Sequence, residues 1–200
     1  FVSNSENGSE IYLYWLSSKV TAKLTQLENS PSSITWSPDG KHVAFSMKVN
    51  AKAPVIAKMP LKPKDAKWAA APRITDRLKH EADGQGYIKP GFSQIFLISA
   101  EGGSPRQLTK GNYNHRGPLS WSPNGTEIFF SGNLTENWEY DFRNSEVYSV
   151  NSQTLKIKSY TSQNGPDYQP KVAPNGNFIS YLGYKDKVQT YQVNQLTIMD

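Results

Sequence analysis

The sequence contains no cysteine among its 200 residues. This absence excludes a disulfide framework and any metal site built on thiolates. It does not select a compartment, since a chain without thiols suits a bacterial cytoplasm or periplasm alike. The fold must therefore rest on hydrophobic packing and hydrogen bonds alone.

Long apolar segments are also absent, because no run approaches the roughly 18 residues that cross a membrane as a helix. We therefore expect no membrane span. The chain begins at Phe1 without a Met or a signal-peptide pattern, and Phe1-Val2-Ser3 resembles the end of a strand. We expect the natural N-terminus to lie upstream.

The excess of positive over negative charge is small, with a formal net charge of +5. Much of the excess is local, because residues 48–67 hold six lysines and three prolines: Lys48, Lys52, Lys58, Lys62, Lys64, Lys67, Pro54, Pro60 and Pro63. A nucleic-acid surface more often interleaves basic residues with stacking aromatics. We interpret this stretch as a solvated loop and expect no nucleic-acid partner.

Sequence patterns of catalytic and metal sites are missing as well. There is no Gly-x-Ser-x-Gly nucleophile elbow and no glycine-rich phosphate loop. His42, His80 and His115 are far apart and lack the spacing of metal ligands. Of the Asp and Asn residues in Pro-Asp/Asn-Gly segments only Asp39 is a carboxylate, which favours turn formation over calcium binding. We expect no metal, no cofactor, no catalytic residue and no activity from this chain by itself.

What the sequence does contain is a repeat of hydrophobic segments and turns. In each copy a short hydrophobic segment is followed 13 residues later by a Leu or Tyr that precedes Thr. A turn resembling Trp-Ser-Pro-Asp-Gly comes next, and then a second hydrophobic segment. The first segments begin at Ile11, Ile95 and Val147, a fourth begins at Leu196, and the turns are residues 36–40, 121–125 and 172–176.

Each hydrophobic segment alternates with period 2 and predicts a strand. The Pro-Asp/Asn-Gly turns predict tight hairpins, because Pro presets φ, Asp or Asn bonds its own backbone, and Gly accepts a positive φ. One repeat of about 50 residues supplies four antiparallel strands, the size of one propeller blade.

We therefore predict an all-β fold: a partial β-propeller of four-stranded antiparallel blades, two complete ones flanked by two incomplete ones. The predicted parts are a blade remnant at 1–25, a blade at 36–109 with a long insert at 48–93, a blade at 121–161, and a truncated blade at 172–200. Trp36 and Trp121 are expected to pack between blades. Unpaired strand edges predict edge-strand self-association of the fragment.

The long connections of the predicted blades all lie at one end, opposite the tight turns. They are the insert at 48–93 and the loops at 133–144 and 110–119. Because loops on a rigid scaffold often bind ligands, this face is the candidate functional surface, and residues 68–92 are expected to pack in an ordered way. The candidate substrate- or partner-facing residues are Arg77, His80, Glu81, Asp83 and Tyr87 in the insert, and Trp138, Glu139 and Tyr140 in the following blade.

The repeat, with Leu-Thr before the turn and Ala-Phe-Ser after it, resembles the propeller repeats shared by TolB and the prolyl oligopeptidase family. Further segments are similar to acylaminoacyl-peptidase-like enzymes: residues 67–72, 76–78, 83–87, 102–109, 117–123 and 138–140. The resemblance covers essentially the whole chain, and the long insert favours the peptidases over TolB. Val172-Ala173 departs from Trp-Ser and weakens the match of the third repeat.

In the enzymes that the chain resembles, an N-terminal propeller caps a C-terminal α/β-hydrolase domain that carries Ser, Asp and His. The resemblance implies a propeller segment of a serine exopeptidase, acylaminoacyl-peptidase- or dipeptidyl-peptidase-like, that caps the active site and restricts peptide access. The implied partners are the peptide substrate and the hydrolase domain, which this sequence does not include, so no catalytic residue is transferred. The alternative is a non-enzymatic TolB-like propeller that binds other proteins.

Overall fold

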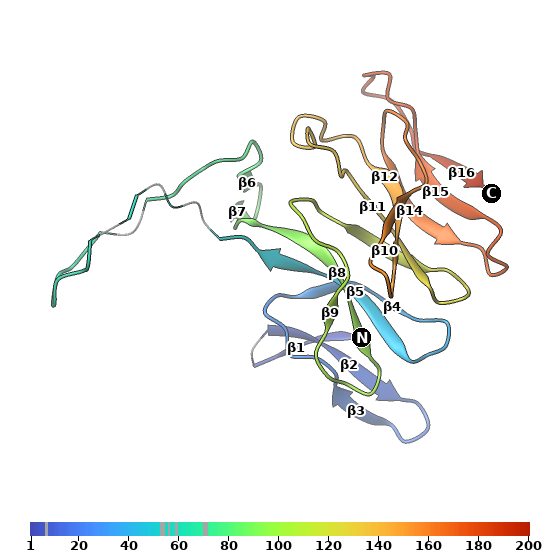
Figure 1. Cartoon of the computed structure of the whole chain (residues 1–200), viewed down its shortest axis with the longest axis horizontal. Coiled ribbons are helices and arrows are strands. Elements are labelled where there is room, and N and C mark those ends of the chain that lie inside the picture. The colour runs from blue at the N-terminus through green and yellow to red at the C-terminus, as the bar shows by residue number, and fades with distance from the viewer. Residues whose placement is uncertain (7, 53–54, 56, 59, 70–71) are drawn as a thin grey trace.

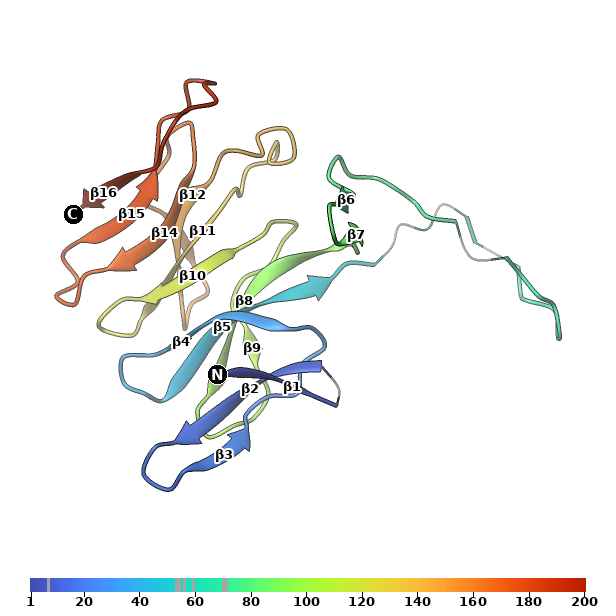
Figure 2. The same ribbon diagram turned by 180° about the vertical axis from the view of Figure 1, so that it is seen from behind.

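The computed structural model describes residues 1–6, 8–52, 55, 57–58, 60–69 and 72–200, so parts of the predicted 48–93 insert and of the 67–72 segment lie outside it. Its elements are antiparallel sheets that stand side by side (Figures 1 and 2). The described part of the chain contains no helix that could span a membrane. The prediction of an all-β fold is confirmed.

Two four-stranded sheets lie between two three-stranded sheets. The first sheet holds β1 (Val2–Ser5), β2 (Gly8–Trp15) and β3 (Val20–Lys23). The second holds β4 (Pro31–Trp36), β5 (His42–Asn50), β8 (Gly91–Ser99) and β9 (Arg106–Gln107), and a separate hairpin of the insert holds β6 (Glu81–Ala82) and β7 (Gly86–Tyr87). The third holds β10 (Arg116–Trp121), β11 (Glu127–Gly132), β12 (Glu146–Asn151) and β13 (Ile157–Ser159). The fourth holds β14 (Asp167–Val172), β15 (Ile179–Gly183) and β16 (Gln195–Met199).

The sheets are held together by three hydrophobic clusters, one at each junction between neighbours. Alternate residues of a central strand enter different clusters: Ala44 packs toward the third sheet, whereas Val43 and Phe45 pack with Ile11 of the first. The cluster between the first and second sheets contains Ile11, Val43, Phe45, Phe96 and Ile98. The cluster between the second and third contains Ala44, Ile95, Leu97, Leu108, Leu119, Ile128, Phe130 and Val150. The cluster between the third and fourth contains Phe129, Val147, Ile179 and Tyr181. Because both faces of the inner sheets are buried, their central strands read as nearly continuous hydrophobic runs.

The first strand of each blade is innermost, since β10 packs against both β4 and β14. These strands end at Trp36, Trp121 and Val172, where the predicted blades began. Each of these three residues pairs with a residue on the far side of the hairpin that follows. The strand therefore has to include it and ends there, before the turn. Trp121 packs against the core between two sheets, as predicted. The same prediction for Trp36 is wrong, because its side chain is 51% exposed and β4 has an inner-strand neighbour on one side alone among the described residues.

The Pro-Asp/Asn-Gly turns close in the predicted way. The Asp39 carboxylate accepts the Lys41 N–H at 3.0 Å and the Ser37 hydroxyl at 2.6 Å. Asn124 accepts the Thr126 N–H at 3.1 Å in the equivalent turn. Each of these side chains therefore accepts a backbone N–H from its own turn and stabilises it, which is the local role that the sequence predicts.

In three sheets a threonine just after the outer strand (β3, β9 or β13) ties that strand to its neighbour (β2, β8 or β12). Each hydroxyl accepts the N–H of the residue that begins the repeated hydrophobic segment and donates to the side chain just before it. Thr25, Thr109 and Thr161 donate to Glu10, Gln94 and Glu146 over 2.7, 2.8 and 2.5 Å, and they accept from Ile11, Ile95 and Val147 over 2.9 Å each. We call this contact the threonine latch. It satisfies buried polar groups at the rim of each core.

The long connections gather at one end of the blades, opposite the tight turns (Figure 1). The strands reach further into the insert than predicted, because β5 and β8 stay paired to Asn50 and Gly91. Gly91 is required there: its φ is +143°, and a Cβ would lie 2.4 Å from the carbonyl oxygen of Val49. Beyond this point the insert leaves the blades as a projecting arm, with Leu61 96% exposed (Figure 1).

Candidate functional site

The root of the insert is fixed to the blades by an aromatic stack. Arg77 lies over the Phe92 ring at 4.2 Å, and Trp138 meets the same ring edge-on at 5.7 Å between centroids. Phe92 belongs to β8, whereas Trp138 belongs to the loop between β11 and β12. A cation on one face and an indole at the edge are both favourable partners for an aromatic ring. The expected packing of the second half of the insert is therefore confirmed around Phe92, although Trp68 remains 43% exposed.

Tyr87 organises the small hairpin of the insert. Its hydroxyl lies 2.7 Å from the Thr75 hydroxyl and donates to the carbonyl of Ile74 at 3.1 Å. Arg73 lies over the Tyr87 ring at 5.0 Å, and the His80 ring lies 6.2 Å away. These contacts order the segment that leads from the arm back to β8.

A groove runs between the insert root and the β11–β12 loop. It consists of two adjoining hollows of about 290 and 220 Å³ that share Lys79, Asn114, Arg116 and Trp138. We call it the insert groove. Of the predicted site residues, Arg77, His80, Tyr87, Trp138 and Glu139 line it.

The other three predicted residues lie outside this groove. Glu81 and Asp83 are exposed on the β6–β7 hairpin, and Tyr140 is 77% exposed at the tip of its loop. The structure thus brings five of the candidates together and leaves three on the surrounding surface. Sequence reasoning did not single out Lys48, Lys79, Lys89 and Arg116, which also line the groove.

Positive charge is crowded at the inner wall of the groove. The Lys48 ammonium donates a hydrogen bond to the Lys89 carbonyl oxygen, which draws it toward other cations. Burial lowers the pKa of Lys48, and the nearby Arg77 and Lys89 lower it further. Such a wall favours the approach of an anionic group.

A buried pair of carboxyl groups lies between the third and fourth sheets at the same end of the blades. Glu146 is 7% exposed and Asp167 is fully buried. Burial raises the pKa of Glu146 to about 7, the Thr161 hydroxyl opposes this, and Asp167 adds to it. Burial likewise raises the pKa of Asp167, whose Oδ1 accepts from Gln163 at 2.6 Å while its Oδ2 has no partner among the described residues.

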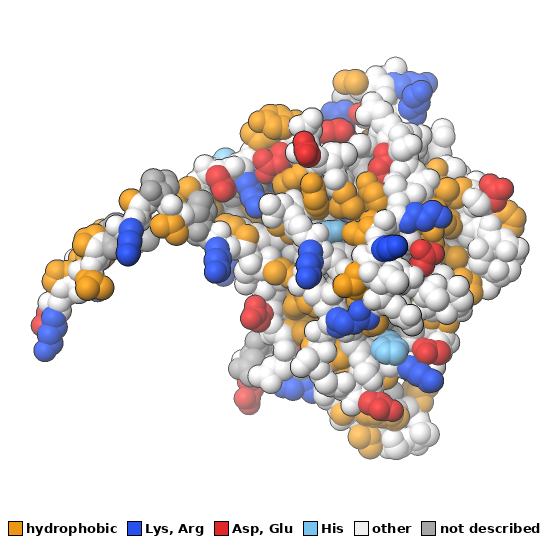
Figure 3. Space-filling view, in the orientation of Figure 1, with side chains coloured by type: hydrophobic (Ala, Val, Ile, Leu, Met, Phe, Trp, Pro, Cys, Tyr) orange, Lys and Arg blue, Asp and Glu red, His pale blue; other side chains and the backbone are white. Residues whose placement is uncertain are grey.

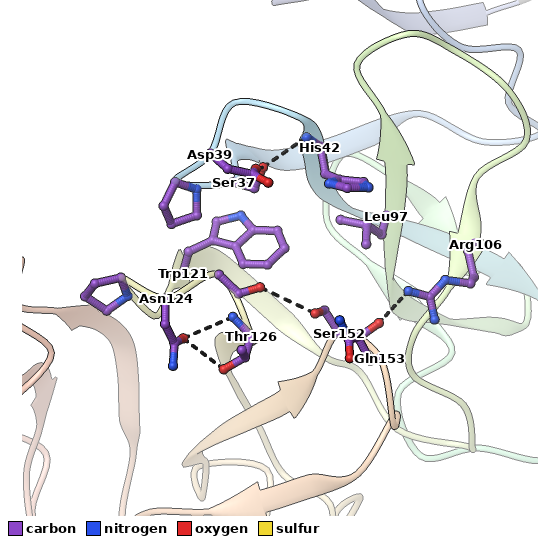
Figure 4. A pocket seen from close by; sticks show the side chains of 13 residues that line it. Ser37, Asp39, His42, Leu97, Arg106, Trp121, Asn124, Thr126, Ser152 and Gln153 are labelled. Atoms are coloured by element: carbon purple, nitrogen blue, oxygen red, sulfur yellow. Dashed lines mark hydrogen bonds between the residues drawn. The ribbon is translucent and has the colours of Figure 1, made fainter.

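A third polar feature, a cleft of about 520 Å³, lies between the second and third sheets at the opposite, tight-turn end (Figure 4). Trp121 lies across it between the Ser37 and Asn124 turns (Figure 4). The Arg106 guanidinium donates to the Ser152 carbonyl oxygen across the cleft. This hydrogen bond joins the two blades, whereas the Asp39 and Asn124 side chains bond within their own turns and Trp121 Nε1 has no partner among the described residues.

His115 lies in the loop before β10, as expected, but its burial was not predicted from the sequence. Its side chain is 1% exposed, its ring packs against Phe130 at 5.2 Å, and Nδ1 lies 3.3 Å from the Ser93 carbonyl oxygen. Burial lowers the pKa of His115 to about 4. The imidazole is therefore neutral at physiological pH and supports the wall behind Asn114 and Arg116.

Comparison with known proteins decides the relationship of the chain. Residues 57–187, about two thirds of it, match the family described as the dipeptidyl peptidase IV (DPP IV) N-terminal region. The chain belongs to this family. It is 26% identical over 137 residues to the uncharacterized peptidase YuxL of Bacillus subtilis, which is 68% of this chain and 20% of that protein. The chain thus spans about one fifth of the length of that relative.

Solved structures show the same fold. The chain superposes over its whole length on 28% of an acylaminoacyl peptidase solved in complex with Z-Gly-Gly-Phe-chloromethyl ketone, with a TM-score of 0.67 and 14% identity. It matches the Pyrococcus horikoshii acylaminoacyl peptidase with a TM-score of 0.63 and 14% identity, over 96% of this chain and 27% of that one. TolB from Acinetobacter baumannii gives 0.62 and 14%, over 100% of this chain and 37% of that one.

These structural likenesses confirm the partial β-propeller that the repeats predict. The family match and the peptidase relative confirm the resemblance to peptidases of the prolyl oligopeptidase family. This member of the DPP IV N-terminal region family is a propeller domain of a peptidase family, and the TolB-like alternative is not favoured.

Proposed function

We propose that the chain is the propeller segment of a serine exopeptidase, acylaminoacyl-peptidase- or dipeptidyl-peptidase-like, that covers the active site and restricts the access of peptides. The observation that carries the proposal is the family match over residues 57–187, which includes the insert root, the third sheet and the loops between them. The catalytic Ser, Asp and His would belong to an α/β-hydrolase domain of the same protein.

The geometry supports a role in selecting substrates by size. The sheets are packed through continuous hydrophobic clusters, so neighbouring blades form a rigid wall. The insert root and the β11–β12 loop stand at one end of this wall and line the groove beside Arg116, the first residue of the innermost strand β10. A rigid wall with a loop-covered rim excludes long or folded chains and admits short peptides.

Shortening the insert tests this function. In the protein at its natural length, residues 51–90 are replaced by an Asn-Gly turn, which the pairing of Asn50 with Gly91 allows. Peptides of about 4 and about 30 residues with the same N-terminal sequence are then compared by kcat/KM. We expect the long-to-short ratio to rise about tenfold, equivalent to about 1.4 kcal/mol of relieved exclusion.

The matched control inserts the same Asn-Gly pair at Glu101, in the tight β8–β9 turn at the opposite end of the blades. It should leave the ratio unchanged. Equal ratios in the shortened variant and the unmodified protein, at matched thermal stability, would contradict a gating role of the insert. Failure of the natural-length protein to hydrolyse either peptide would contradict the peptidase itself.

A further inference from the structure

The insert groove carries an excess of positive charge. Its lining has five Lys and Arg residues against two carboxylates, Asp76 and Glu139, a net charge of +3 before His80 is counted. The five cations are Lys48, Arg77, Lys79, Lys89 and Arg116. Figure 3 shows Lys and Arg side chains along the projecting arm and near its root.

None of these five cations is neutralised within the described part of the chain. The one ion pair found there joins Arg143 to Asp186, outside the groove. A solvated surface would let long cationic side chains spread apart, because exposed charges gain little from holding one geometry. Here Lys48 is instead held beside Lys89 by a hydrogen bond to its backbone, so the fold maintains the crowding.

The shape of the groove suits an extended peptide. Trp138 is shared by its two hollows, and Tyr87 lines the outer one. Arg116 is the first residue of β10, an innermost strand, so the groove leads from the arm toward the centre of the blades. Asp76 and Glu139 in the lining disfavour a long polyanion such as nucleic acid.

We propose that the insert groove binds the carboxylate groups of peptides and so favours acidic peptides or short peptides with a free C-terminus. This inference deepens the proposed function and rests on it for the identity of the ligand as a peptide substrate. The two sources of carboxylate, the C-terminus and Asp or Glu side chains, share one chemistry and are separated by the test.

The test measures binding directly, by fluorescence anisotropy, with the protein at its natural length. Four labelled hexapeptides are used: neutral with an amidated end, neutral with a free C-terminus, one with two internal Glu and an amidated end, and one with two internal Lys and an amidated end. The groove variant is Lys79→Glu with Lys89→Glu, both exposed residues. The matched control is Lys19→Glu with Lys23→Glu, two exposed residues of the β2–β3 hairpin, which changes the net charge by the same amount.

We expect the carboxylate-bearing peptides to bind more tightly than the amidated neutral peptide and the Lys peptide. Binding should weaken at least tenfold in the groove variant and less than twofold in the control, and 0.5 M salt should weaken it in the unmodified protein. A preference for the free C-terminus alone or for internal Glu alone supports the proposal and identifies the source.

Equal binding of all four peptides, binding of none, or equal losses in the groove variant and the control would overturn the proposal. The hydrolysis ratio of long to short peptides is measured on the same variants. An intact size preference with no carboxylate binding removes this inference and leaves the proposed function standing. Carboxylate binding with no size preference would contradict the proposed gating function and leave the carboxylate-binding groove standing.

Discussion

Replacing Glu146 with Gln should make the protein more stable above neutral pH. Glu146 is buried beside Asp167, with no cation paired to either among the described residues. The second blade carries Gln94 at the equivalent position, where its Oε1 accepts from Thr109 at 2.8 Å and its amide donates to the Gly111 carbonyl. The protein itself therefore shows that an amide fits the threonine latch.

The magnitude follows from the raised pKa. The ordinary pKa of the Glu146 carboxyl is 4.5 and the folded protein raises it to about 7. The folded state therefore holds an extra proton between these values, and stability falls as the pH rises through that window. Above pH 7 the cost of the charge is at most about 3.5 kcal/mol, because each tenfold change in proton affinity is worth about 1.4 kcal/mol, and solvent screening lowers it to about 2 kcal/mol. Glu146→Gln removes this cost.

Thermal unfolding at pH 5 and pH 8 measures the effect. We expect Glu146→Gln to lie within about 1 kcal/mol of the unmodified protein at pH 5 and to gain about 2 kcal/mol at pH 8, a rise of roughly 4–8 °C for a chain of this size. Glu136→Gln, in an exposed loop, is the control and should change neither value. If the difference between Glu146→Gln and the unmodified protein is the same at both pH values, the reasoning is refuted.

Three further changes test the fold and the insert root. Thr109→Val should cost about 2–4 kcal/mol in urea unfolding, because it leaves the Ile95 N–H and the Gln94 side chain without a buried partner; a cost below 0.5 kcal/mol would contradict the latch. Gly91→Ala should cost about 1–3 kcal/mol by the same assay, since its φ is +143° and the Cβ would meet a carbonyl oxygen at 2.4 Å; an unchanged midpoint would contradict that strain. Trp138→Ala should remove the edge contact with Phe92, worth about 0.5–1.5 kcal/mol, and speed tryptic cleavage of the insert several-fold; an unchanged cleavage rate would show that the insert is held elsewhere.

The repeated turns made much of the fold predictable from sequence. Ser-Pro-Asp-Gly specifies a hairpin through local chemistry, so the strands on either side of Asp39 and Asn124 follow directly. The side of a strand that each residue faces was harder to predict. Val43 and Ala44 are both buried because sheets cover both faces, and a simple alternation of apolar and polar residues does not anticipate this.

The missed features depend on contacts between distant residues. The threonine latch joins residues 15 apart, and its signal was present as Glu10, Gln94 and Glu146 standing one place before each repeated hydrophobic segment. His115 becomes buried through packing on Phe130, which its own sequence context does not reveal. The cations of the insert groove come from four separate stretches of chain, so their convergence depends on tertiary structure.

The three hydrophobic clusters described between neighbouring sheets also govern how the molecule loses structure. Each blade contacts its neighbours and no blade beyond them through these clusters, so the array resembles a one-dimensional stack with nearest-neighbour coupling. The stabilising free energy between blades then comes from the contacts at each junction. Truncating Phe45 weakens the first junction and leaves the contacts of Tyr181 at the third junction intact. We therefore expect one junction to open before the others, so that two blades part locally without global unfolding.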